Sequence, residues 1–356
     1  YNKETTWYVD EDGILRLQIG DETYGEGTGE EKLNESIKIS ANVETSSDYT
    51  KATISVVIEY EGEIERVRIN GEIIEVVKNE EGKYVGRIEV SENGSYKVEV
   101  EEKNGTKNKE LLKVEEITED MEIWNREDME SFRDRVNSGR TYEGRTVRVM
   151  QDIDLGGDSN NWVPITDFLG TFEGNKHIIS NLYIDSNKYV NLGLFSTIGS
   201  GSSIQNTILE NVYINNSYQS PNIHTSTGGF VAVANGIINN CGVNSGTISS
   251  TNTAISNGRW YYIYVGGIVG QIYTNNIINN CYNKANVQGT RQRLGYNSVA
   301  VGGIIGDLTG DSEIKNCYNT GQITGNGGHA MVGGIIGQWT GISKVYNLYN
   351  TGTVYG

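Results

Sequence analysis

Apolar and polar residues alternate along most of the chain, and this period of two predicts β-strands. Between residues 37 and 117 the alternation runs through short segments such as ATISVVIEY and SYKVEVEE. Turn pairs such as Asn70-Gly71 and Asn93-Gly94 separate the segments. Short strands at this spacing, about seven of them, are typical of a β-sandwich, so residues 37–118 are predicted to form one.

A different period appears in NREDMESFRDRVNSG, residues 125–139, which predicts a helix. Asn125 is a suitable N-cap, with Asp128 three residues later, and Gly139 is a C-terminal stop. An apolar stripe lies along one face of this helix. The stripe consists of Met129, Phe132 and Val136.

Five copies of a glycine-centred unit follow one another from about residue 190 onward. LGLFS, GGFVA, GGIVG, GGIIG and GGIIG align on glycines spaced 36, 38, 36 and 31 residues apart. The aligned glycines are Gly193, Gly229, Gly267, Gly303 and Gly334. Each is followed by two further short apolar strands, and such a unit buries its apolar face only by stacking on copies of itself.

A right-handed parallel β-helix, or solenoid, over residues 119–356 fits this pattern best, with the short α-helix as its N-terminal cap. The alternative is a β-propeller, whose blades need four antiparallel strands where each repeat supplies three. Residues 1–36 contain two short strands, at 7–20, and an acidic linker. The whole chain is therefore predicted to be all-β.

The repeats resemble the GLUG-motif repeats of bacterial surface proteins. This resemblance covers about residues 140–356 and is carried by GGIVGQIYTNNIINNCYNKANV, GGIIGDLTGDSEIKNCYNTGQI and GGIIGQWTGISKVYNLYNTGTV. It departs from the pattern at Leu192, at Ala232 and at Gly242-Val243. Residues 90–117 resemble the closing strands of bacterial immunoglobulin-like modules. Together these resemblances imply a secreted or cell-surface, adhesin-like protein, and they supply no catalytic residues.

The net charge of −17 is confined to the front of the chain. Residues 1–156 contain 38 acidic and 21 basic side chains, whereas residues 157–356 contain 8 of each. Nucleic-acid binding needs basic patches that neutralise phosphates, so this distribution argues against it. No stretch is apolar and long enough to span a membrane as a helix.

The three cysteines, Cys241, Cys281 and Cys317, fall at one repeat position, which Thr207 and Leu348 occupy in the outer copies. We interpret this position as an interior packing site that holds buried free thiols. One disulfide between stacked neighbours, and a metal or reactive site, are the alternatives.

Asparagines recur at two positions of the repeat. The first set is predicted to stack into a polar ladder and consists of Asn206, Asn240, Asn280, Asn316 and Asn347. Asn319 and Asn350 precede Thr-Gly, so we expect them at corners with positive φ.

Two further patterns bear on chemistry. Asp152, Asp154 and Asp158 lie in one loop-like stretch, which suggests a calcium site, although the spacing does not match an EF-hand. No other cofactor is indicated. A polysaccharide-active enzyme would need convergent carboxylates, and the acids of the repeats do not recur at one position. The cluster Asp307, Asp311 and Glu313 is interpreted as solvated turn acids, and the three histidines have no evident partner.

The best candidate for ligand binding is the edge of the solenoid where the repeats vary in length. Four such segments are 216–227, 249–264, 289–300 and 325–331. Aromatic and arginine side chains concentrate there, and such groups stack on sugars or anchor a protein partner. The candidate residues are Arg259, Trp260, Tyr261, Tyr262, Arg291, Arg293 and Tyr296.

We therefore expect a non-enzymatic extracellular protein of a bacterial, Gram-positive cell surface that serves adhesion or scaffolding. Its partner would be a host or environmental glycan or protein. The first alternative is a subunit of a surface filament or pilus-like polymer, built from copies of the chain. These copies would join through an uncapped C-terminal β-helix end or an exchanged strand from residues 7–20. The second alternative is a polysaccharide-active β-helix enzyme.

Overall fold

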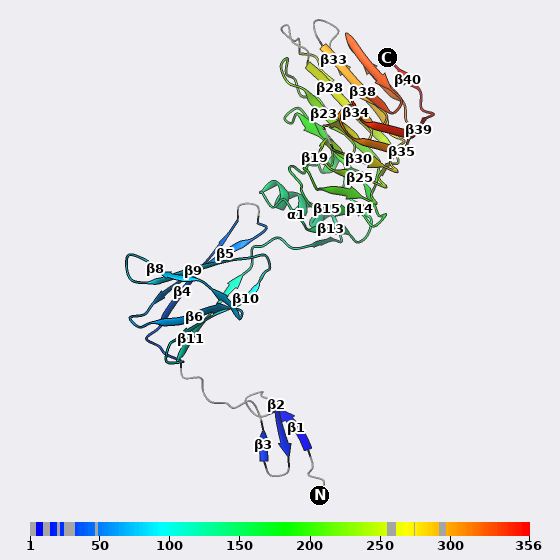
Figure 1. Ribbon diagram of the computed structural model, residues 1–356. Coiled ribbons are helices and arrows are strands. Elements are labelled where there is room, and N and C mark those ends of the chain that lie inside the picture. The colour runs from blue at the N-terminus through cyan, green and yellow to red at the C-terminus, as the bar shows by residue number, and fades with distance from the viewer. Residues whose placement is uncertain are drawn as a thin grey trace. The chain divides into compact units, whose positions relative to one another are not determined.

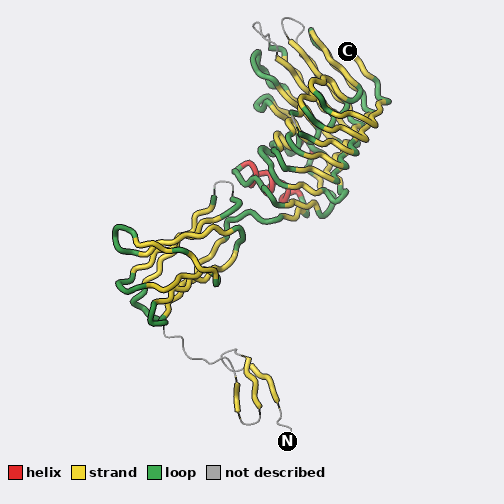
Figure 2. Tube along the Cα trace, viewed as in Figure 1, coloured by secondary structure: helices red, strands yellow, loops and turns green. Residues whose placement is uncertain are grey.

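The computed structural model describes residues 5–9, 15–19, 22–24, 33–46, 49–254, 261–273, 275–291 and 297–356. Strands dominate the chain, as Figures 1 and 2 show. It divides into two compact units, one of residues 1–46 and 51–117, the other of residues 47–50 and 118–356. Each unit is described separately below.

The first unit contains a small antiparallel sheet and a β-sandwich. The small sheet consists of β1 (Thr5–Val9), β2 (Leu15–Ile19) and β3 (Glu22–Tyr24). The first layer of the sandwich is antiparallel, in the order β4 (Lys38–Thr45), β5 (Ala52–Glu59), β9 (Tyr84–Val90), β8 (Val76–Lys78). The second layer is β11 (Lys107–Val114), β10 (Gly94–Glu102), β6 (Ile64–Ile69), β7 (Glu72–Ile74).

One apolar core joins the two layers of the sandwich. Ile54, Val56 and Ile58 alternate with more exposed residues along β5, so that one face of the strand is buried. They share a buried cluster with Val67 of β6 and Val98 of β10 in the other layer. This is the alternation of inward and outward side chains from which the sandwich was predicted.

The second unit is a parallel β-solenoid with four named sheets, S1 to S4, whose strands pair in register between successive rungs. S1 has thirteen strands in two columns that merge at its C-terminal end. Its first column is β12 (Met121–Ile123), β13 (Thr146–Val149), β15 (Thr171–Glu173), β20 (Ser203–Gln205), β25 (Ile237–Asn239), β30 (Ile277–Asn279), β35 (Glu313–Asn319) and β39 (Lys344–Asn350). Its second column is β14 (Ile153–Asp154), β16 (Ile178–Ser180), β21 (Ile208–Glu210), β26 (Gly242–Val243) and β31 (Tyr282–Asn283), which again pairs with β35.

The other three sheets complete each rung. S2 is β17 (Tyr183–Ser186), β22 (Val212–Asn216), β27 (Gly246–Asn252), β32 (Asn286–Arg291), β36 (Ile323–Asn326) and β40 (Val354–Tyr355). S3 is β18 (Asn191–Leu192), β23 (Thr225–Gly228), β28 (Tyr261–Gly266), β33 (Asn297–Gly302) and β37 (His329–Gly333). S4 is β19 (Phe195–Ile198), β24 (Val231–Ala234), β29 (Val269–Ile272), β34 (Ile305–Gly310) and β38 (Ile336–Gly341). Within a rung the chain passes from S3 to S4, then through S1 to S2 (Figure 1).

The repeated glycines form the bend between S3 and S4. A Cβ at Gly267 would lie 2.2 Å from the carbonyl oxygen of Gly303 and 2.4 Å from Cγ of Asn283. One at Gly303 would lie 2.2 Å from the carbonyl oxygen of Gly334. Successive bends therefore approach more closely than any side chain permits, and this explains the glycine in each repeat.

An asparagine ladder marks the bend between the two columns of S1. All five members have φ between 54° and 56°, the left-handed region that asparagine tolerates. Nδ2 of Asn280 donates to Oδ1 of Asn240 at 3.0 Å, and Nδ2 of Asn240 donates to Oδ1 of Asn206 at 3.0 Å. The next step is displaced, because Nδ2 of Asn316 donates to Oδ1 of Asn279 at 2.9 Å.

A second asparagine ladder is buried, and it differs from the prediction. Asn319 and Asn350 are not among the residues with positive φ. Asn319 is 0% exposed; its Nδ2 donates to the carbonyl oxygen of Gly321 at 2.8 Å and to Oδ1 of Asn350 at 2.7 Å. These side chains therefore satisfy the backbone of the following corner from inside the coil.

The cysteines form a column in the solenoid core. Cys241, Cys281 and Cys317 are all buried free thiols. Cys317 pairs in register with Leu348, which packs against the same apolar core. Burial raises the pKa of the Cys281 thiol well above its usual value. The position thus holds buried thiols and, in the last rung, an apolar leucine side chain.

Helix α1 (Arg126–Asn137) closes the N-terminal end of the solenoid core. Asn125 is its N-cap, with Oδ1 accepting from the backbone N of Asp128 at 2.9 Å. Phe132 is fully buried, and its ring centroid lies 5.6 Å from that of Phe168 and 5.8 Å from that of Phe172. The apolar stripe seen in the sequence therefore covers the first rungs.

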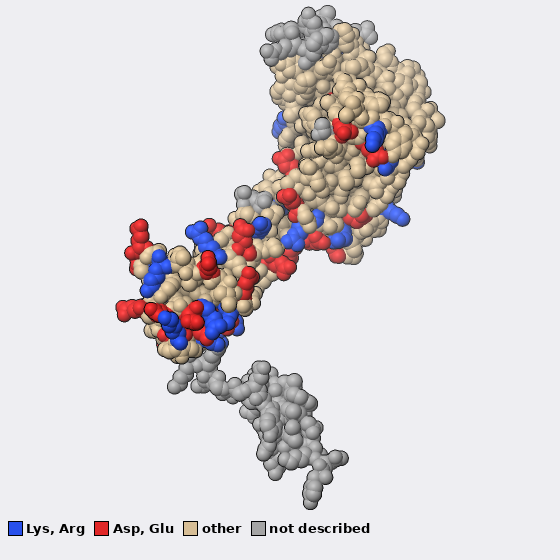
Figure 3. Space-filling model, in the orientation of Figure 1, with Lys and Arg blue, Asp and Glu red and all other residues tan. Residues whose placement is uncertain are grey.

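The predicted fold class is confirmed: the chain is mostly β, with a sandwich of antiparallel sheets followed by a helix-capped β-solenoid. The charged side chains follow this division. Figure 3 shows them gathered on the first unit, while most of the visible solenoid surface carries neither acids nor bases.

Candidate functional site

The variable edge of the solenoid lies where the chain passes from S2 of one rung to S3 of the next rung. Its described part contains an aromatic cluster, which we call the aromatic edge. The members are His224, Tyr261, Tyr262 and Tyr264. Tyr262 and Tyr264 are two residues apart on β28 and therefore lie on the same face of this strand. Thr225 of the previous rung pairs with Ile263, and this register places His224 beside Tyr262.

Three rings of the aromatic edge are nearly parallel. The centroid of the His224 ring is 5.6 Å from that of Tyr262 and 5.7 Å from that of Tyr264, with interplanar angles of 10° and 7°. The two tyrosine rings are 5.5 Å apart at 4°. Tyr261 is tilted against His224 by 53°. The edge therefore presents the aligned rings of His224 and Tyr262, with Tyr264 stacked beneath them, and exposed rings of this kind can contact flat apolar or sugar surfaces.

His224 is electrically neutral at this edge. Burial, and then the charge of Arg291, lower the pKa of His224. Its Nδ1 accepts a hydrogen bond from the backbone N of Tyr262 at 3.1 Å, so the ring proton resides on Nε2. This arrangement positions the ring as an aromatic and hydrogen-bonding group.

Tyr264 lies beneath the surface of the edge. It is 6% exposed, and burial followed by the charge of Asp307 raises its pKa far above the usual value. Its phenol therefore stays protonated and is no nucleophile, and its ring supports those of His224 and Tyr262 from within the edge. His224 and Tyr264 were not selected from the sequence. The signal that could have found them is the two-residue alternation on β28 and its alignment with the preceding rung.

The structure places the predicted ligand-binding residues in different settings. Tyr261 and Tyr262 belong to the aromatic edge, both partly exposed. Arg291 ends β32 and is 1% exposed, so it underlies the surface instead of being displayed on it. Its side chain is buried along its whole length, which the sequence alone does not reveal. The four remaining residues lie outside the described part of the chain: Arg259, Trp260, Arg293 and Tyr296.

Asp152 and Asp154 organise the chain at the start of the solenoid. Asp152 Oδ1 accepts from the backbone N of Ile178 at 2.9 Å and lies 3.2 Å from Nδ1 of His177. Asp154 Oδ1 accepts from Nδ2 of Asn181 at 2.8 Å. Both carboxylates thus hold one rung to the next.

In the described part of the chain, Asp152, Asp154 and Asp158 do not form a group placed to hold a calcium ion. Among the described residues no group of three or more His, Cys, Asp or Glu side chains is placed to hold a metal ion. Asp158 is exposed in the middle of the 3-10 turn η1 (Gly157–Ser159). The arrangement around Asp152 and Asp154 is explained by hydrogen bonds alone.

The acids interpreted as solvated turn residues differ from that expectation. Asp307 is 2% exposed on β34, because the glycine bends bring S3 and S4 together over it. Asp311 is exposed. Glu313 accepts a hydrogen bond from the Tyr346 hydroxyl and pairs with Nζ of Lys315 at 3.1 Å. The three do not converge as a carboxylate pair would in a glycosidase.

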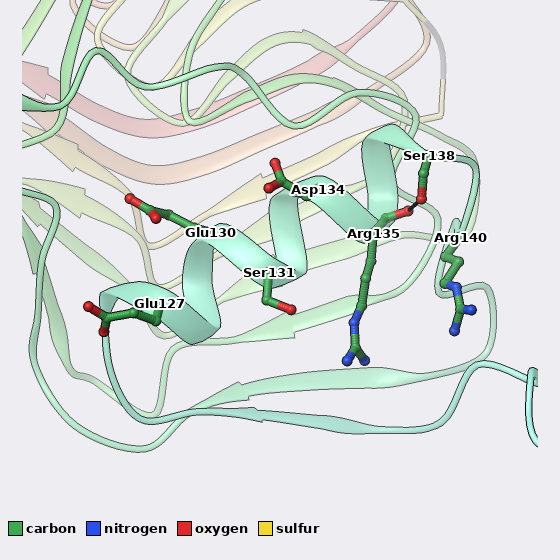
Figure 4. A pocket seen from close by; sticks show the side chains of 7 residues that line it. All are labelled: Glu127, Glu130, Ser131, Asp134, Arg135, Ser138 and Arg140. Carbon is green, nitrogen blue, oxygen red and sulfur yellow. Dashed lines mark hydrogen bonds between the residues drawn. The ribbon is translucent and has the colours of Figure 1, made fainter.

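A shallow hollow of about 660 Å³ follows the outer face of α1 (Figure 4). Figure 4 shows Glu127, Glu130 and Asp134 on one side and Arg135 and Arg140 on the other. The lining is charged and carries no aromatic ring. This hollow therefore follows the polar, solvent-facing side of the helix.

Within the described residues no helix is both apolar enough and long enough to cross a membrane.

Residues 297–324 match the GLUG motif. The match runs from β33 through β34 and β35 into β36, which is one rung of the solenoid. The chain is also similar to Halomucin of Haloquadratum walsbyi (strain DSM 16790 / HBSQ001), with 30% identity over 115 residues. That alignment covers 32% of this chain, and it spans about 1% of the length of Halomucin. The chain is thus a β-solenoid protein that contains a GLUG motif.

Proposed function

We propose that this chain is part of an extracellular surface protein that works by binding or scaffolding and catalyses no reaction. The solenoid presents repeated strands and an aromatic edge, and the GLUG motif forms one of its rungs. The similarity to Halomucin supports a repeat protein of this general kind. A bacterial, Gram-positive source belongs to the same proposal.

The aromatic edge is the observation that carries this function. Parallel rings of His224, Tyr262 and Tyr264 lie at the point where rungs differ in length, on a domain with few charged side chains. Rigid aromatic groups supply contact area at low entropic cost, whether the partner is a glycan or a protein. The sandwich, which we propose to be immunoglobulin-like, would serve as a spacer.

The test is binding of the full chain to a glycan array and to a panel of immobilised extracellular proteins. The variants Tyr262→Ala and His224→Ala should each weaken the observed binding by about tenfold. Tyr349→Ala is the matched control, since this tyrosine is 55% exposed and stacks on Tyr318 elsewhere in the solenoid. Equal losses in the control, or no loss in the edge variants, would remove the edge from the proposal.

A filament or pilus-like polymer is the second candidate. The last rung exposes large apolar side chains, with Trp339 at 50% and Ile342 at 79%. Val345 and Leu348 pack only partly against the core there. Such a surface suits a further rung, from the same polypeptide or from a second copy. Electron microscopy of the purified chain separates the two candidates, because a filament subunit forms polymers and a monomeric adhesin does not.

The proposed lack of catalysis has its own test. Purified chain should not cleave acidic or neutral polysaccharides, as measured by release of reducing ends. Sustained turnover that persists after further purification would replace the binding proposal with the enzyme alternative.

A further inference from the structure

A second surface lies away from the aromatic edge, at the first strands of S2. It is a hollow of about 450 Å³, which we call the tyrosine hollow. The residues that line it are Asp154, Gly156, Gly157, Asp158, Asn181, Leu182, Tyr183, Asn211 and Tyr213. They come from β14, η1, β17 and β22, and from the turns that precede η1, β17 and β22.

Two stacked tyrosines form the aromatic side of the hollow. Tyr183 and Tyr213 pair in register on β17 and β22, with ring centroids 4.9 Å apart and an interplanar angle of 11°. Tyr213 is 40% exposed, and the next residue of its column is the smaller Thr247. The stack therefore ends at Tyr213, whose ring remains available to a ligand.

A chain of hydrogen bonds fixes the polar side. Nδ2 of Asn181 donates to Oδ1 of Asp154 at 2.8 Å, and Nδ2 of Asn211 donates to Oδ1 of Asn181 at 2.6 Å. Both asparagines have positive φ, at 57° and 52°, which holds them at the turns before the strands. The polar groups are thereby positioned before any ligand arrives.

The charges around the hollow select among ligands. The hydrogen bond from Asn181, and then that from Gly156, lower the pKa of Asp154, so this carboxyl is ionised at neutral pH. Asp158 adds a second exposed carboxylate, and no lysine or arginine lines the hollow. Arg126 lies beside the hollow: its Nε donates to the carbonyl oxygen of Asp154 at 2.9 Å, and its guanidinium lies against Gly156. The two carboxylates can accept hydrogen bonds from the hydroxyl groups of a ligand, whereas they repel the negative charge of an acidic ligand.

The outer face of S2 continues from the hollow as a polar surface that begins at the exposed Asp185. Nδ2 of Asn215 donates to Oδ1 of Asp185 at 2.9 Å, and Oγ of Ser249 donates to Oδ1 of Asn215 at 3.2 Å. Gln288 and Thr324 extend the same column. Their hydroxyl and amide groups repeat at the strand spacing of about 4.8 Å, which is comparable to one sugar ring.

From this juxtaposition we propose that the tyrosine hollow binds one end of a neutral hexose oligosaccharide, with the following sugars running along the polar face of S2. The Tyr213 ring covers the apolar side of a sugar, and Asp154, Asp158 and Asn211 accept or share its hydroxyl hydrogens. This site goes beyond the proposed function, because it lies on S2 and does not involve the aromatic edge.

Isothermal titration calorimetry of the full chain tests the site, with mannohexaose, laminarihexaose and cellohexaose as probes and hexagalacturonate as the acidic comparison. At least one neutral probe should bind, and Tyr213→Ala should weaken that binding by about tenfold. Asp158→Asn should weaken it less and should raise the relative affinity for hexagalacturonate. Circular dichroism spectra that match those of the unchanged chain show that each variant is folded.

Three outcomes would overturn the site: no binding of any neutral probe, equal or tighter binding of hexagalacturonate, or an equal loss in Tyr349→Ala. Tyr262→Ala is included so that the two surfaces are tested separately. Loss of neutral-probe binding in Tyr262→Ala but not in Tyr213→Ala would move the glycan to the aromatic edge and refute the tyrosine hollow.

Discussion

Gln271 and Asp307 lie in register on adjacent rungs of S4, and Nε2 of Gln271 donates to Oδ2 of Asp307 across 3.0 Å. Oγ1 of Thr309 donates to the same oxygen at 3.1 Å. Within the described part of the chain, Oδ1 of Asp307 has no hydrogen-bond partner, and neither has Oε1 of Gln338 on the next rung. Two buried acceptor oxygens therefore receive no hydrogen bond, which lowers the free energy of unfolding.

Asp307→Asn should therefore stabilise the solenoid at neutral pH by about 1–3 kcal/mol, because an amide supplies the missing donor and needs no ionisation. Burial raises the pKa of Asp307 above its ordinary value of 3.8, so the folded chain holds this proton more tightly than the unfolded chain. The free energy of unfolding thus falls as pH rises from about 3.8 through the raised pKa, and the asparagine variant should lose this dependence.

Urea unfolding between pH 4 and pH 8 measures both effects, with fluorescence of the buried Trp162 as the reporter for the solenoid. Asp311→Asn is the control, since Asp311 is exposed and its replacement should change little. A variant at position 307 that is less stable at pH 8 would contradict the assignment of an orphan acceptor.

The outer asparagine ladder predicts a particular order of stabilities at position 280. Asn280→Ala should destabilise the solenoid by about 1–2 kcal/mol, because alanine is strained at the φ of 54° and cannot bond Asn240. Asn280→Gly keeps the conformation and loses only the hydrogen bond, so its cost should be smaller. Thermal unfolding of the two variants checks the order, and equal stabilities would mean that backbone conformation contributes nothing there.

The cap formed by α1 depends on Phe132. Phe132→Ala should lower the free energy of unfolding of the solenoid by about 3–5 kcal/mol, because it empties an aromatic cluster that is closed to solvent. Ser131→Ala, at the neighbouring position of the same helix, serves as the control for helix propensity. Hydrogen exchange should show the first rungs opening earlier in the Phe132 variant, whereas uniform exchange along the solenoid would argue against a cap.

The thiols should be inert until the chain unfolds. Burial keeps the reagent from the sulfur atoms, so Ellman's reagent should label none of the 3 cysteines in native protein and all of them in guanidinium chloride. Rapid labelling of the native chain would contradict the buried column. A total below three after unfolding without reductant would instead reveal a disulfide.

Much of the solenoid could be predicted because its repeats carry steric requirements. Gly267 and Gly303 recur where no side chain fits, and the position of Cys281 holds threonine, cysteine or leucine in the other copies because the core accepts a small or apolar group there. The stripe on α1 could be predicted for a similar reason, because the spacing of Met129, Phe132 and Val136 places them on one face of a helix. Such features depend on local spacing, which a single sequence displays.

The remainder depends on which rungs face each other. The sequence places Asp307 near a turn and Arg291 in a segment of variable length, yet both side chains are buried in the solenoid. His224 gains its partners only from the rung that follows, and Asn319 is an inner hydrogen-bond donor whereas a corner residue was expected. Each of these contacts joins residues about one repeat apart, and no pattern within a single repeat encodes them.

The asparagine ladder has a consequence for how such a protein changes its length. Each rung brings its own donor and its own acceptor, and Asn316 shows that the pairing tolerates a shift from Asn280 to Asn279. Duplication of a complete rung would therefore create new contacts of the same kind and break none that are essential. The length of the solenoid can therefore change by duplication of the gene segment that encodes one rung, and the added rung extends the existing core.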